Sequence, residues 1–447
     1  MISTRLDHET TPIERFLRPF QRFAHTESSG GIVLLLTTVV ALVWANSVWW
    51  ESYHHLWEIP VRMALGGLSF EMSLHHFIND GLMVVFFFMV GLEIKREMLV
   101  GELASPRAAA LPIAAAAGGM IIPALLYAAL NAGGVGAPGW GIPMATDIAF
   151  ALGILALMGP RVPTGLKVFL AALAIVDDLG AVLVIALFYT DDLNLMALAL
   201  GGATLVGLVM LNISGARHPG AYTVLGIILW GAFLSSGVHA TIAGVLLAMT
   251  IPARTRINTD EFLSYGRHYL DQFDQAGTED KNVLTNAGQQ EAIHALESSC
   301  EAAQAPLQRL EHDLHTWVAF GIIPLFALAN AGLRLNVDVG AAMSHPITLG
   351  VILGLVIGKP IGITLLAWAA VRSGLASLPQ GVGWGQIHGV SWLGGIGFTM
   401  SLFVANLAFG EGSALLDAAK LGVLTASVVA AAVGWILLRR KPRESAA

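Results

Sequence analysis

The sequence has few of the residues on which soluble and disulfide-bonded proteins depend. Only 12% of its 447 residues are Asp, Glu, Lys or Arg, whereas a soluble domain has about 25%. Hydrophobic residues make up 55%, and long apolar runs recur along the chain, which indicates a polytopic membrane protein. The single cysteine, Cys300, excludes an internal disulfide and a multi-cysteine metal site. Because the first residues are polar and charged, we expect no cleavable signal peptide.

The apolar runs predict an all-α membrane protein with about twelve transmembrane helices. We place these spans near residues 30–48, 74–98, 107–130, 138–158, 165–189, 194–212, 219–236, 238–251, 313–332, 344–371, 385–409 and 414–438.

Polar stretches divide the chain into further segments. The N-terminal segment, 1–28, is either a basic helix on the membrane surface or a plain tail. Short alternating segments around a Gly-Gly pair suggest an external β-hairpin at 57–71. A polar insertion at 252–311 separates helices 1–8, within 29–251, from helices 9–12, within 312–438, and a tail follows at 439–447.

The distribution of positive charge predicts the orientation of these segments. If both termini are cytoplasmic, the tails and cytoplasmic connections contain all Lys and Arg residues except Arg62, Arg334, Lys359 and Lys420. Cytoplasmic connections of membrane proteins carry such an excess of positive charge. We therefore expect both tails and the insertion in the cytoplasm.

Two adjacent carboxylates, Asp177 and Asp178, lie at the centre of the apolar run LAALAIVDDLGAVLVIALFY. A charge at the bilayer centre costs from roughly 3 to more than 10 kcal/mol. Asp147 and Lys359 lie at a similar depth in two other spans. An ion pair with Lys359 would satisfy one carboxylate and leave two without a cation. Such groups can bind H⁺ or a hard cation such as Na⁺ or Li⁺, and competition at one site would couple the two fluxes.

Two of the predicted spans contain helix-breaking residues. In GIPMATDIAFALG (141–153), Pro143 removes a backbone hydrogen bond four residues before Asp147. The eleventh span contains GGIG (394–397). Paired interruptions of this kind are typical of a transporter site formed by half-helices. We expect Asp147 to offset the positive N-terminal helix ends there, and Lys359 the negative C-terminal ends.

Seven motifs distributed along the chain identify a family resemblance. They are NDGLMVVFFFMVGLEIKRE (79–97), ATDIAFALG (145–153), LAIVDDLGAV (173–182), SGVHATIAGV (236–245), EHDLHTWVAFGIIPLFALANAG (311–332), GKPIGI (358–363) and GIGFTMSLFVANLAF (395–409). In these motifs the chain resembles the NhaA family of bacterial sodium/proton antiporters over nearly its whole length. The resemblance implies inverted repeats in spans 3–5 and 10–12, with spans 4 and 11 interrupted.

The resemblance also implies a role for each matched residue. Asp177 and Asp178 would bind the cation and exchange protons, with Asp178 the surest Na⁺ ligand and Lys359 paired with Asp177. Thr146 and Asp147 would lie where the interrupted helices cross. The other implied residues are Asp80, on the cytoplasmic or site-proximal path, and a pH-response group of Glu93, Glu97, His239, Glu311, His312 and His315. Each of these histidines is equally explained as an interfacial or packing residue.

The implied protein is a transporter and not an enzyme, and it needs no cofactor. It would exchange cytoplasmic Na⁺ or Li⁺ for external H⁺ across the bacterial inner membrane, electrogenically and under pH control. Its partners would be these ions and the lipid bilayer. A second copy of the chain could bind through the 57–71 hairpin to form a homodimer, and no nucleic acid is expected as a partner. The length of the 252–311 insertion departs from the family pattern and leaves the pH profile open.

Other classes of protein fit the motifs less well. A membrane aspartic protease would have its two Asp residues on different helices. The sequence His312-Asp313-Leu314-His315 is not the HExxH motif of zinc hydrolases, and GLVIGKP (354–360) lacks the spacing of a phosphate loop. A passive cation channel is the remaining alternative, although channels usually build a selectivity ring by symmetry.

Overall fold

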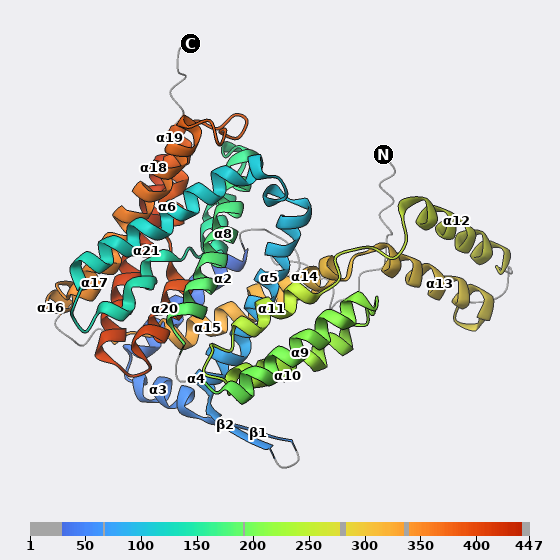
Figure 1. Ribbon diagram of the computed structural model, residues 1–447, viewed down its shortest axis with the longest axis horizontal. Helices are drawn as coiled ribbons and strands as arrows, with labels where there is room; N and C mark the ends of the chain where they lie inside the picture. Colours follow the sequence, from blue (N-terminus) through green and yellow to red (C-terminus); the bar gives the residue numbers. More distant parts are fainter. Residues whose placement is uncertain (1–28, 66–67, 191–192, 278–282, 335–338, 440–447) are drawn as a thin grey trace, which may run out of the picture.

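The computed structural model shows a helical bundle with a small β-hairpin at one end (Figure 1). We call this the hairpin end. The structure describes residues 29–65, 68–190, 193–277, 283–334 and 339–439.

The longer helices form the bundle, and shorter ones connect or interrupt them. The α-helices are α2 (Ser29–Ala45), α3 (Trp50–Glu58), α4 (Leu74–His76), α5 (Met83–Val100), α6 (Pro106–Asn131), α7 (Ile148–Leu157), α8 (Thr164–Phe188), α9 (Leu195–Ile213), α10 (Pro219–Leu234), α11 (Ile242–Thr250), α12 (Thr259–Gln275), α13 (Ala287–Ala303), α14 (Pro306–Trp317), α15 (Ile323–Asn330), α16 (Val339–Met343), α17 (Pro346–Leu353), α18 (Lys359–Arg372), α19 (Trp384–Gly394), α20 (Phe398–Phe409) and α21 (Ala414–Arg439). Turns of π-helix join several of them into longer rods, at Phe77–Leu82, Val318–Ile322 and Gly354–Gly358.

The apolar helices agree with a multi-pass membrane protein. Within the described residues, eight helices are long and apolar enough to cross a membrane, and up to ten if each of two bent pairs counts as one span. The predicted spans at 219–236 and 238–251 correspond to the shorter helices α10 and α11. The all-α membrane fold is therefore confirmed, while the count of twelve and the inverted repeats stay predictions.

Glycines allow the central helices α6 and α18 to pack in backbone contact. A Cβ atom on Gly118 would collide with the carbonyl oxygen of Gly362, and a Cβ atom on Gly362 would collide with that of Gly118. Small residues permit this close approach between membrane helices. On the same surface, a Cβ atom on Gly119 would lie 3.7 Å from Cε of Lys359. The packing therefore fixes the stem of Lys359 against α6.

The hairpin consists of β1 (Pro60–Leu65) and β2 (Leu68–Ser73), which pair antiparallel. Arg62 lies opposite Glu71, and Nη2 of Arg62 is 2.9 Å from Oε1 of Glu71. The strands lie close to the range predicted for a hairpin, 57–71. Figure 1 shows the ribbon projecting from the bundle.

The polar insertion contains a pair of packed helices, α12 and α13, which project from the bundle (Figure 1). A capping box of Asn258 and Glu261 begins α12. The next helix, α14, begins at Pro306 and continues through a π-helical turn into α15. The boundary predicted at 311–312 therefore falls inside a continuous helical segment.

Candidate functional site

The interruptions of two spans meet in the interior of the bundle. A 3-10 helix, Ala137–Met144, is followed by three non-helical residues before α7 begins at Ile148. Helices α19 and α20 meet at an angle of 44° across the GGIG motif. The backbone N–H of Asp147 donates a hydrogen bond to the carbonyl of Ile396 at 2.7 Å, which joins the two interruptions. The predicted pair of interrupted helices is thus present, and the two breaks are in contact.

The carboxylate of Asp147 lies at the N-terminal ends of both half-helices. Its Oδ1 accepts a hydrogen bond from the backbone N–H of Phe150 at 2.9 Å, which caps α7. Its Oδ2 accepts from the backbone N–H of Thr399 at 3.1 Å and from Oγ1 of Thr399 at 2.5 Å, at the start of α20. A negative charge there offsets two helix dipoles and satisfies free N–H groups. The position of Asp147 agrees with the expectation from the sequence.

Lys359 is fully buried and contacts both a carboxylate and a helix C-terminus. Its Nζ lies 2.8 Å from Oδ2 of Asp177. It also donates a hydrogen bond to the carbonyl of Met144, the last residue of the 3-10 helix. The ammonium group therefore meets the negative end of a half-helix and the charge of Asp177 together. The contact with a helix C-terminus was expected from the sequence pattern, and the pairing with Asp177 was implied by the family resemblance.

Thr146 completes the surroundings of Asp177. Its Oγ1 lies within hydrogen-bond distance of Oδ2 of Asp177, at 2.6 Å, and of the carbonyl of Gly394, at 2.9 Å. A hydroxyl group has one proton to donate, so these two acceptors share it. Lys359 and Thr146 thus converge on one oxygen of Asp177 and leave the other free.

Two buried carboxylate oxygens at this site lack a donor. Oδ1 of Asp177 and Oδ1 of Asp178 accept no hydrogen bond from the residues that the structure describes. Asp177 and Asp178 are 0% and 1% exposed, so solvent does not cover them. A buried acceptor without a donor costs about 1–3 kcal/mol, and more when it is charged. These two oxygens are thus suited to bind a proton or a cation.

A second acidic group lies farther along α5. Glu97 and Glu311 share the guanidinium group of Arg96, with N···O distances of 3.3 Å and 3.2 Å. Glu93 lies one helical turn before Glu97 on α5. The structure therefore brings together three of the predicted pH-response residues around Arg96. Arg96 itself was not predicted as a member of this group. His312 and His315 follow Glu311 on α14 and are exposed.

His239 and Asp80 lie together in a different part of the molecule. Nε2 of His239 is 3.4 Å from Oδ1 of Asp80, and Nε2 of His76 is 3.0 Å from Oδ2 of the same carboxylate. They line a cavity of about 560 Å³ that also includes Tyr189 and Glu411. At 1.5 Å per residue, the helix between Asp80 and Glu93 spans about 20 Å.

His239 lies beside Asp80 and apart from the acidic group of Glu93 and Glu311, and its part in the pH response stays a prediction. Asp80 follows the hairpin closely in the chain and lies toward the hairpin end, and its place on a cytoplasmic or site-proximal path stays a prediction. Sequence motifs identified both residues but gave no information about which helix ends meet in space.

The sequence analysis also missed a buried chain of amides near this cavity. Nδ2 of Asn330 donates to Oδ1 of Asn79 at 2.9 Å, and Nδ2 of Asn406 donates to Oδ1 of Asn330 at 2.6 Å. These bonds connect α15 and α20 to the π-helical turn before α5. The only sign of this network in the sequence is one Asn residue in each of three apolar spans. The spacing of these residues along the chain does not show that their side chains meet.

Comparison with known proteins identifies the family. A family model described as Na+/H+ antiporter 1 matches residues 21–438. The protein named Na(+)/H(+) antiporter NhaA of Koribacter versatilis is 52% identical over 433 residues, which cover 96% of this chain and 93% of that protein. Proteins of the same name from Oleidesulfovibrio alaskensis and Acidithiobacillus ferrooxidans are 53% and 49% identical, each over 96% of this chain and over 95% and 98% of their own lengths. The chain belongs to the Na+/H+ antiporter 1 family.

Proposed function

We propose that this chain exchanges Na⁺ for H⁺ by competition of the two ions for the carboxylates of Asp177 and Asp178. Sodium/proton antiport is the function that its family performs, so the chain is a transporter and not an enzyme. The observation that carries the proposed site is the pair of buried carboxylate oxygens without a donor. Either a proton or a monovalent cation would neutralise such a carboxylate.

The charge balance of the site supports competition. Asp147, Asp177 and Asp178 are buried with Lys359 as the cation beside them. Asp147 is occupied by the helix ends, so the exchangeable charge belongs to Asp177 and Asp178. Once the carboxylates are neutralised by protons or by Na⁺, binding of the other ion is disfavoured, because its positive charge would be uncompensated. This exclusion couples the two fluxes.

Lys359 gives Asp177 a role different from that of Asp178. A cation that binds Asp177 must compete with the ammonium group for the carboxylate. Lys359 keeps the carbonyl of Met144 as a second acceptor, so it can release Asp177 without losing every partner. We propose that Asp178 takes the cation first and that the Asp177–Lys359 pair opens and closes with proton exchange.

The finer features of transport belong to the same proposal. With both termini and the insertion in the cytoplasm of a bacterial inner membrane, Na⁺ or Li⁺ would leave as H⁺ enters, with net movement of charge. The group of Glu93, Glu97 and Glu311 around Arg96 would regulate exchange by pH, because protonation of one carboxylate changes the balance around one guanidinium group. The projecting β1–β2 ribbon would supply a homodimer contact.

The proposed site is tested by transport in everted membrane vesicles. A fluorescent indicator of ΔpH is followed while Na⁺, Li⁺ or K⁺ is added at several pH values. Asp178→Asn should abolish the Na⁺ response, because the amide cannot neutralise a cation. Asp260→Asn, which removes an exposed carboxylate from the start of α12, is the matched control and should transport normally. Normal exchange by Asp178→Asn would overturn the site, and no response of the unmodified protein to any cation would overturn the function.

A further inference from the structure

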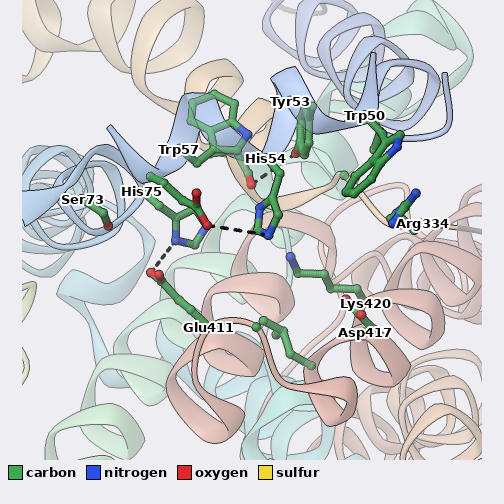
Figure 2. A pocket seen from close by; sticks show the side chains of 16 residues that line it. Trp50, Tyr53, His54, Trp57, Ser73, His75, Arg334, Glu411, Asp417 and Lys420 are labelled. Atoms are coloured by element: carbon green, nitrogen blue, oxygen red, sulfur yellow. Dashed lines mark hydrogen bonds and ion pairs between the residues drawn. The ribbon is translucent and has the colours of Figure 1, made fainter. Parts of the chain in front are cut away.

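A second cavity, of about 580 Å³, lies at the hairpin end and contains none of the proposed transport residues (Figure 2). Helix α3, the segment around His75, the chain near Gly332 and the start of α21 form its walls. Its size lies within the range of small-molecule sites, roughly 300–1,000 Å³. Space for a ligand is therefore present.

Lys420 is the buried cation of this cavity. The residue is 7% exposed, and its ammonium group makes no hydrogen bond or salt bridge with any part of the chain that the structure describes. Figure 2 shows the side chain rising from α21 with its ammonium group pointing into the cavity toward His54. An ammonium group has three donors, and burial without acceptors is unfavourable. An anion in the cavity would satisfy it.

The nearby carboxylates already have other contacts. Glu411 contacts His75, and Oε1 of Glu58 lies 3.9 Å from Nε2 of His54. Asp417 lies one turn before Lys420 on the same helix, yet no oxygen of it comes within the 4.0 Å of an ion pair. Asp417 and Glu411 attract Lys420 through space, and neither makes a contact with its ammonium group among the described residues.

Arg334 adds a second positive charge to the same cavity. Its guanidinium carbon lies 3.5 Å from the ring centroid of Trp50, a cation–π contact that leaves its N–H groups available for an acceptor. Trp57 and Tyr53 extend the aromatic wall (Figure 2). Two cations beside flat apolar surfaces match an oxyanion attached to a small organic group.

We propose that this cavity binds an oxyanion, a phosphate or a carboxylate, through Lys420 and Arg334. A phospholipid headgroup and a free anion offer the same chemistry, so the test distinguishes these two sources. The proposal is independent of the ion-exchange site, because the residues of that site do not line the cavity.

The test measures thermal unfolding of the purified, delipidated protein in detergent. Inorganic phosphate is titrated against sodium chloride at matched ionic strength, matched Na⁺ concentration and constant pH. Phosphate at ten times its Kd should raise Tm by about 2 °C above the chloride control. Lys420→Met should lose this shift, Lys420→Arg should retain it, and Lys167→Met, which changes a lysine of α8 outside the cavity, should behave as the unmodified protein.

Arg334→Gln keeps the test decisive if Lys420→Met does not fold, because Arg334 is exposed and its loss leaves the buried packing intact. This variant should raise the apparent Kd for phosphate several-fold. Phosphatidylethanolamine micelles, added first, should abolish the phosphate response if a headgroup is the ligand and leave it unchanged if a free anion is. The proposal is overturned if phosphate, acetate and phospholipid all fail to shift Tm, or if the Lys420 and Arg334 variants respond as the unmodified protein does.

Discussion

Two buried lysines show different solutions to the same electrostatic problem. Lys359 is 0% exposed and is compensated inside the protein by Asp177 and the carbonyl of Met144. Lys420 is 7% exposed and faces a cavity without an ionic partner among the described residues. Burial of a charge without compensation is costly. The first lysine therefore belongs to an internal charge balance, whereas the second depends on what enters the cavity.

The largest change of stability is expected when the ammonium group of each lysine is removed. Lys359→Met should lower the free energy of unfolding by about 3–5 kcal/mol, because Asp177 keeps a buried charge without a counter-ion. It should also alter the pH dependence of exchange in vesicles. Lys420→Met is the matched variant and should not lower the stability in buffer without phosphate, because no bonded partner is lost and an uncompensated buried charge is removed. The stabilities of both variants are measured by thermal unfolding. An equal loss of stability in the two variants would contradict the proposed difference between the two lysines.

A smaller effect is predicted for Glu411, a carboxylate in the cavity of Lys420. Its hydrogen bond with His75 holds the pKa of Glu411 below its ordinary value of 4.5. A folded-state pKa below the unfolded value contributes stability above that unfolded pKa, and this contribution is lost as the pH falls through the folded pKa. Glu411→Gln should therefore lower Tm at pH 7, and this effect should shrink as the pH falls below 4.5 and vanish below the lowered pKa of Glu411. The side chain is half-exposed, so the difference at pH 7 should be less than about 1 kcal/mol. An equal decrease of Tm at pH 7 and at acid pH would show that Glu411 stabilises the protein by something other than its negative charge.

The sequence was sufficient to predict contacts that follow from charge balance at one depth. Asp147, Asp177 and Lys359 lie in three different spans at a similar depth, and a low-dielectric interior requires such groups to meet. Their positions at the helix ends followed from the two interrupted motifs and the helix dipole. For the helix-end positions of Asp147 and Lys359, elementary electrostatics and one-dimensional position contained enough information, whereas the choice of Asp177 as the partner of Lys359 came from the family resemblance.

Other contacts could not be predicted because they depend on which helix ends meet in three dimensions. Arg96 has the same signature as any interfacial arginine until Glu311 approaches it from α14. The contact of His239 with Asp80 was not predicted, because a motif does not specify its neighbours. The cavity of Lys420 combines residues from four distant segments, and in the sequence Lys420 is only a lysine near the end of a span.

The most direct test of the account is the number of protons released when Na⁺ binds. Purified protein in weakly buffered detergent solution is mixed with Na⁺ near neutral pH, and a pH indicator records proton release while isothermal titration calorimetry records binding. Competition at Asp177 and Asp178 predicts that protons are released as Na⁺ binds, in excess of one for each Na⁺ because exchange moves net charge, and that both signals are lost in Asp178→Asn. Binding of Na⁺ without release of protons would contradict competition as the coupling mechanism.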